Sequence, residues 1–327
     1  MTILTNDATV AGTVAPGTRL GSGLGFAVLS AMSFGLSGSL AKGMLDAGWS
    51  AGAAVAVRVL VAALVLVVPA VLALRGRWGL LRRNAGIVAA YGLVAVAGCQ
   101  LAYFNAVDHM QVGVALLIEY TAPVAVIGWL WLRYGHRPGR LTVTGAALAA
   151  VGLVLVLDLV SGADLSVVGV VWALLAMVGA AVYFILSASE GNGLPPLVLA
   201  AGGLVLGAVA LLLAGAVGVV PMHASTAAVS YDGAQVAWWV PVLGLGVITA
   251  ALAYVTGIAA SRRLGSRLAS FVALLEVLFS LVFAWLLLAQ LPRPVQFLGG
   301  ALIVVGVVVV KLGERGTVAP APADPAG

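Results

Sequence analysis

The chain has 327 residues, of which 63% are hydrophobic and 8% charged, and its formal net charge is +5. A mean hydropathy of +1.17 lies outside the range of soluble globular domains and predicts an integral membrane protein. A nucleic-acid partner is disfavoured, because the basic residues are scattered through short segments between long apolar runs. The single cysteine, Cys99, excludes an intrachain disulfide and a cysteine-based metal site.

Residues 1–23 and 313–327 are expected to be disordered cytoplasmic tails, because neither segment carries a long apolar run. The runs between them have the 18 to 25 residues needed to cross about 30 Å of hydrocarbon. They are apolar all round, without the alternation of a membrane barrel, so the fold class is all-α. We expect ten transmembrane helices, over residues 24–43, 51–74, 85–107, 112–132, 141–160, 166–187, 195–219, 237–260, 268–289 and 295–312.

Lys and Arg are distributed unevenly between the loops on the two sides of the membrane. With the N-terminus inside, most of the 16 basic residues fall on the cytoplasmic side, as the positive-inside rule requires. The sequence therefore predicts a multi-pass protein of the plasma or inner membrane with both termini in the cytoplasm.

The second half of the chain repeats the first. At one constant offset Trp131 matches Trp285, Gly145 matches Gly299, and Gly152 matches Gly306. Residues 24–160 and 166–312 are thus two five-helix units, and an odd number of spans gives the two units opposite orientations. Inverted repeats of this kind are typical of alternating-access transporters, whose substrate site lies near the bilayer midplane.

Four segments carry a resemblance to a known family: Leu116–Pro123 (LLIEYTAP), Leu274–Val277 (LLEV), Ala284–Leu288 and Gly299–Gly306. Together with the five-plus-five pattern, they resemble the EamA-type transporters of the drug/metabolite transporter superfamily over residues 24 to 312. The resemblance implies export of amino acids, other metabolites or drugs. Two departures stand out: the usual Glu-Pro pair of helix 9 is Glu276-Val277 here, and the usual Gly-Glu pair closing that helix is Ala289-Gln290.

Three ionisable residues at membrane depth are the leading site candidates, because such groups are costly there and normally face a bundle interior or a water-filled path. Glu119 is expected in helix 4, four residues before a helix-breaking Pro123, and Glu276 in the matching region of helix 9. Either carboxylate could hold a substrate ammonium or carry a proton; the alternative is a structural role. Arg58 in helix 2 either binds a substrate carboxylate or neutralises Glu119.

Polar and aromatic residues of other spans either line a substrate cavity or hydrogen-bond between helices. The candidates for substrate contact are Gln100, Tyr103, Asn105, Tyr120, Tyr183 and Tyr254.

An enzymatic function is not expected. The three histidines lie in three different loops, which disfavours a metal cluster, and no Gly-rich phosphate loop precedes a basic helix start. We therefore expect no cofactor.

The sequence predicts a secondary transporter that exports small metabolites such as amino acids, with protons as the possible coupling ion. A multidrug exporter is the alternative within the same class. A non-transporting membrane assembly or lipid-handling protein is the alternative from another class. The expected partners are a small-molecule substrate and the lipid bilayer, and the chain is expected to be a monomer or a homodimer.

Overall fold

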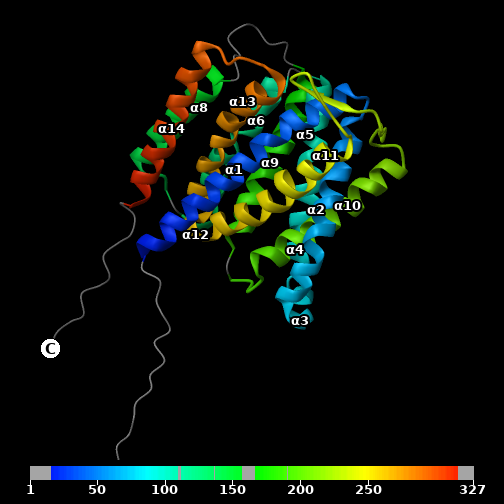
Figure 1. Ribbon diagram of the computed structural model, residues 1–327. Helices are drawn as coiled ribbons and strands as arrows, with labels where there is room; N and C mark the ends of the chain where they lie inside the picture. The colour runs from blue at the N-terminus through cyan, green and yellow to red at the C-terminus, as the bar shows by residue number, and fades with distance from the viewer. Residues whose placement is uncertain (1–15, 110–111, 136, 157–165, 190, 316–327) are drawn as a thin grey trace, which may run out of the picture.

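The computed structural model describes residues 16–109, 112–135, 137–156, 166–189 and 191–315. The predicted tails lie mostly outside these residues, although α1 already begins at Pro16 and α14 ends at Arg315. The chain is a bundle of helices, and Figure 1 shows α14 standing beside α8 at one edge, with α2 and α10 toward the other. In chain order the elements are α1 (Pro16–Asp46), α2 (Ala51–Leu74), α3 (Trp78–Arg83), α4 (Ala85–Ala90), η1 (Tyr91–Gly98), α5 (Cys99–His109), α6 (Val112–Glu119), α7 (Ala122–Tyr134), α8 (Arg140–Val156), α9 (Val167–Ala188), α10 (Pro196–Ala216), β1 (Val229–Tyr231), β2 (Ala234–Val236), α11 (Trp239–Leu243), η3 (Gly244–Leu252), α12 (Ala253–Ala273), α13 (Leu275–Leu288) and α14 (Pro294–Arg315).

Eight helical stretches in the described residues are long and apolar enough to cross a membrane. The helices Arg140–Val156 and Leu275–Leu288 are apolar but shorter. One of the eight, Trp239–Ala273, is interrupted at Gly265, whose φ of +77° and ψ of 161° are not helical. This is the position at which the sequence predicts a loop between two spans. The structure thus agrees with a multi-pass helical protein, and the number ten stays a prediction.

Two helices are interrupted at matching positions of the two halves. The helix containing Glu119 breaks at Tyr120 and Thr121, where the Thr121 N–H donates to Ile118 O at 3.1 Å. The other breaks at Leu274, whose N–H donates to Phe271 O at 3.1 Å. Both bonds span three residues in place of four, so both breaks are local tightenings of the helix. The second break forms with valine, not proline, at position 277.

A pair of π-helical segments also recurs in the two halves. η1 precedes α5 in the first half, and η3 precedes α12 in the second. Each π-helical turn shifts the helical register, and such turns are frequent at functional sites.

Glycines bring α8 and α14 into backbone contact. A Cβ on Gly145 would lie 2.6 Å from Gly306 O, and one on Gly152 would lie 2.5 Å from Gly299 O. In the repeat, Gly145 matches Gly299 and Gly152 matches Gly306. The contact of Gly145 with Gly306 therefore becomes the contact of Gly299 with Gly152 when the two halves are exchanged. Reciprocal contacts of this kind are what a two-fold relation between the halves produces.

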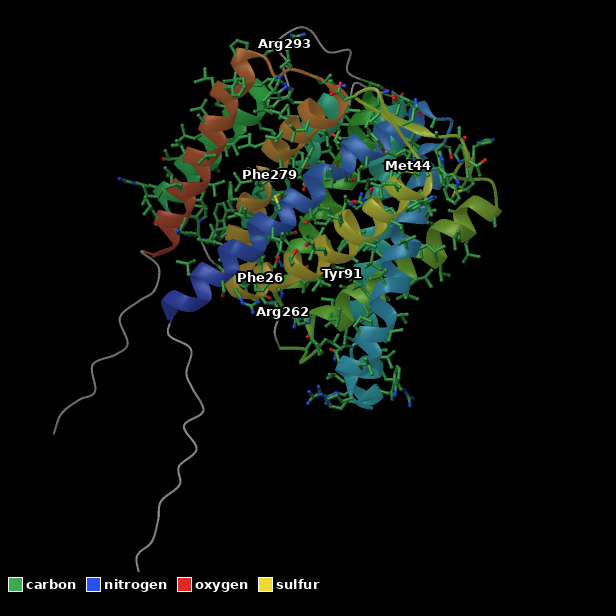
Figure 2. The ribbon with its side chains drawn as sticks, viewed as in Figure 1. Phe26, Met44, Tyr91, Arg262, Phe279 and Arg293 are labelled. Carbon is green, nitrogen blue, oxygen red and sulfur yellow. The ribbon has the colours of Figure 1, made fainter. Side chains whose placement is uncertain are left out.

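The described residues include a β-hairpin, which the all-α prediction lacked. Its strands pair Val229 with Val236, and the turn Asp232-Gly233 has positive φ at both residues, 47° and 81°. Asp-Gly is the sequence signature of such a turn, so the signal was present. The hairpin packs on the end of α1 near Met44, which is labelled in Figure 2.

Tyr231 connects this hairpin to α1 by a hydrogen bond. Its hydroxyl donates to Leu40 O at 2.7 Å, and burial raises the pKa of Tyr231 to about 12, so the hydroxyl keeps its proton at neutral pH. Tyr231→Phe should lower the free energy of unfolding by about 1 kcal/mol. Thermal unfolding in detergent measures the effect, with Ser230→Ala on the exposed face of the same strand as control. Equal stability of the two variants would contradict this role of the hydroxyl.

Candidate functional site

A cavity of about 130 Å³ lies among α1, α5, the α6–α7 break, α9, α12 and the start of α13. Both membrane carboxylates, Glu119 and Glu276, line it. Among the residues that line it in the described part of the chain, none is Lys or Arg. Five aromatic side chains also line it, Phe34, Tyr120, Tyr183, Phe184 and Tyr254, together with mainly small residues such as alanine and serine.

Glu119 reaches the cavity because it is the last residue of α6, immediately before the break. The Cys99 thiol donates to its Oε1 at 3.6 Å and also lies 3.4 Å from Ala176 O. Pro123, in the first turn of α7, lines the same wall. The break therefore places the Glu119 carboxylate at the cavity. An unbroken membrane helix would make all of its backbone hydrogen bonds within itself, and the break interrupts them here.

Glu276 lies in the first turn of α13, just after the other break. The positive end of a helix dipole favours a carboxylate at this position. Tyr120 at the first break and Glu276 at the second both line the cavity, so the two breaks meet there. α1 passes close by, because a Cβ on Gly35 would lie 2.8 Å from Glu276 O.

Arg58 is buried behind the cavity wall and is not one of the residues that line it. Its Nη2 donates to Thr249 O at 2.7 Å, in the π-helical segment η3, and its guanidinium carbon lies 5.7 Å from the centroid of the Phe34 ring. Within the described residues no carboxylate lies within ion-pair distance of Arg58. Phe34 therefore contacts both the guanidinium and the cavity, and Arg58 supports the wall in this conformation.

Four of the six other candidates line the cavity: Gln100, Tyr120, Tyr183 and Tyr254. Tyr103 and Asn105 do not. Tyr103 packs in a small cluster with Ile118, and the Asn105 side chain donates to Leu101 O at 2.8 Å on its own helix.

Several residues of the site carried a signal that the sequence analysis did not use. Ala27 and Ser30 lie on the same face of α1 as Phe34, at spacings of three and four residues, and line the cavity with it. Tyr91, labelled in Figure 2, is fully buried, and its ring centroid lies 5.8 Å from Tyr183 and 6.4 Å from Tyr254. Tyr91 therefore packs behind Tyr183 and Tyr254, which line the cavity.

Gly257 is the point where this wall is tightest. The hydroxyls of Tyr183 and Ser30 lie directly over its Cα, and a Cβ there would lie 2.8 Å from Ser30 Oγ and closer still to the Tyr183 hydroxyl. Gly257→Ala should therefore destabilise the protein by about 1–3 kcal/mol, because the neighbours must move. The measurement is thermal unfolding, with Gly128→Ala, a position open to 4 Å, as the control.

Adding Tyr183→Phe to Gly257→Ala removes the clashing oxygen and should restore most of the stability. A double variant as unstable as Gly257→Ala alone would show that the tyrosine hydroxyl is not the obstacle.

The arrangement suits an organic cation. Two carboxylates provide negative charge, and the faces of aromatic rings attract ammonium groups within about 6 Å. A metal ion has less support, since the described residues contain no group of three His, Cys, Asp or Glu side chains that could hold one.

Comparison with known proteins gave one family and one fold. The model of the EamA-like transporter family matches residues 21–158 and again residues 167–312. A solved crystal structure superimposes with a TM-score of 0.69 at 20% sequence identity, covering 91% of this chain and 99% of the other. At that identity the likeness concerns the fold alone. The search of curated proteins gave no match.

Proposed function

Because the chain belongs to the EamA-like transporter family, whose members are membrane transporters, we propose that it is a secondary transporter working by alternating access. In this proposal the chain crosses the membrane ten times as two inverted five-helix repeats, with both termini in the cytoplasm. The paired helix breaks, the paired π-helical segments and the reciprocal glycine contacts support the repeat.

The substrate we propose is a small metabolite with an ammonium group, such as an amino acid, moved outward. The single observation that carries this proposal is the meeting of Glu119 and Glu276 in one cavity whose described lining has no basic residue. A multiply charged anion would find no cation in the described cavity wall to balance its charge, since Arg58 lies behind Phe34. Amines and amino acids with an exposed ammonium therefore fit better than multiply charged anions.

Size favours a metabolite over a drug. The cavity volume of about 130 Å³ is below the range of roughly 300–1,000 Å³ for pockets that hold drug-sized ligands. The five aromatic side chains of the wall are the observation that favours a multidrug exporter as the second candidate. A non-transporting protein on the same scaffold would have no need of two carboxylates facing a cavity.

Proton coupling is the proposed energy source. Two carboxylates that share a cavity titrate as a coupled pair, and a cation between them replaces a proton. Exchange of an outgoing ammonium for an incoming proton at Glu119 and Glu276 would couple export to the proton gradient.

The test compares the culture media of cells that express the protein with those of cells carrying an empty vector, by untargeted mass spectrometry. We expect a small amine or amino acid to accumulate in the medium only with the protein. Its release should fall when the proton gradient is collapsed with an ionophore. Accumulation of larger aromatic compounds would favour drug export, and an unchanged medium across all amines would contradict the proposed substrate.

A further inference from the structure

A second hollow, remote from the carboxylates, lies on the flank of the bundle between α2, α3, α4 and α10. Its volume is about 470 Å³. It is lined by apolar side chains along its length, such as Val71 and Leu74 on α2 and Val205 on α10, and at one end by Arg82 on α3. The floor is closed where α4 and α10 touch, because a Cβ on Gly202 would lie 2.7 Å from Val88 Cγ1.

The end of this groove is strongly basic. Arg75, Arg77, Arg82 and Arg83 are all exposed within one short segment around α3. In Figure 2 nitrogen-bearing side chains gather at the tip of the molecule formed by α3. The lining residues fall within 67–88 and 198–206, and the longer segments 51–107 and 191–231 around them contain no Asp or Glu; the acidic residue nearest to them in sequence, Glu190, lies outside the described residues.

The position of α3 relative to the bilayer supports a lipid as the occupant. Leu80 and Leu81 pack against the core, whereas Trp78 is 50% exposed at the groove end. Tryptophan at such a position is typical of the membrane interface. A groove that is apolar in the hydrocarbon region and basic at the interface matches an amphiphile with an anionic head.

We propose that this groove binds an anionic phospholipid, with an acyl chain between α2 and α10 and the phosphate against Arg82. Lipid acyl chains are as apolar as the groove, so the transfer of a chain from the bilayer into the groove changes the free energy little. The headgroup charge therefore selects the lipid. Basic pockets on the cytoplasmic side of membrane proteins bind anionic headgroups by the same electrostatics.

The test uses the full-length purified protein, delipidated in detergent and given equal amounts of phosphatidylglycerol and phosphatidylcholine with identical chains. Native mass spectrometry counts the lipids that stay bound. We expect phosphatidylglycerol to be retained in clear preference to phosphatidylcholine. Arg82→Gln should reduce this preference about fivefold, the effect of about 1 kcal/mol for one arginine near a lipid surface. Arg140→Gln, an exposed arginine of α8, is the charge control.

A second pair of variants tests the groove itself. Val205, 38% exposed, lines it, whereas Val209, one turn further along α10 and 50% exposed, does not. Val205→Trp should fill the groove and lower the retention of phosphatidylglycerol, and Val209→Trp should leave it unchanged. Equal retention of the two lipids by the wild type, or equal retention by the two tryptophan variants, would overturn the proposal. Neither readout depends on transport.

Discussion

Glu119→Gln should abolish transport while the protein still inserts and folds. Glutamine has the shape of glutamate and keeps an oxygen that can accept from the Cys99 thiol, so the local packing survives. It removes the charge that faces the cavity and the group that would carry a proton. A hydrogen bond to a charged group contributes about 1.5–3 kcal/mol, equivalent to roughly a 10- to 150-fold loss of affinity. Loss of the proton carrier adds to this effect.

The measurement is the export rate of the compound found in the culture medium, at matched levels of protein in the membrane. Glu119→Asp keeps the charge and should keep part of the activity. Asp46→Asn is the matched control for removal of a carboxylate, because among the described residues Asp46 pairs only with Lys42, at an exposed position, and such pairs contribute little. Export at the wild-type rate by a well-expressed Glu119→Gln protein would remove Glu119 from the mechanism.

Gly152→Leu should prevent the stable packing of α8 against α14. The Cβ alone would lie 2.5 Å from Gly299 O and 2.8 Å from Ile303 N, and both are backbone atoms that cannot rotate away. Overpacking a well-packed contact lowers the free energy of unfolding by about 1–3 kcal/mol. For a leucine placed against backbone atoms, we expect a loss at or above the top of that range. The helices must separate by the width of a side chain to accommodate it.

Fluorescence-detected gel filtration after heating measures the loss. Gly128→Leu is the control, because nothing lies within 4 Å of a Cβ at that position. The reciprocal contact gives a second, sharper expectation: Gly306→Leu should be as damaging as Gly152→Leu. A Gly152→Leu protein that survives the same temperature as the Gly128→Leu control would show that the two helices do not pack through these glycines.

The features that follow from composition and periodicity were predictable from the sequence. Long apolar runs gave the helices, and Pro123 together with Glu119 marked one helix break. The repeat of the glycines was visible in the sequence, and the structure brings Gly145 into contact with Gly306 and Gly152 with Gly299. The break at Leu274 was harder to anticipate, because it forms from two hydrogen bonds that span three residues and involves no proline.

Depth in the membrane is readable from a sequence, but the direction in which a side chain points is not. Arg58 lies in the first half of α2, and its guanidinium points to Thr249 O behind Phe34. Gln100 and Tyr103 are one turn apart on α5, and only Gln100 lines the cavity. The π-helical segment η1 immediately before α5 shifts the register between the two segments, so the ordinary spacing of 3.6 residues does not carry the inward face from η1 into α5. An apolar run gives no warning of such a segment.

The central claim is that Glu119 and Glu276 face a water-accessible cavity that receives small cations. Cys99 offers the most direct test, because it is the single cysteine of the chain and lines the cavity beside Glu119. The measurement is the rate at which Cys99 in native membranes reacts with a methanethiosulfonate reagent carrying an ethylammonium group, compared with the ethylsulfonate reagent of similar size. We expect the cationic reagent to react clearly faster in native membranes, and the difference to shrink when the protein is denatured. Labelling by neither reagent before denaturation, or faster labelling by the anion, would contradict the claim.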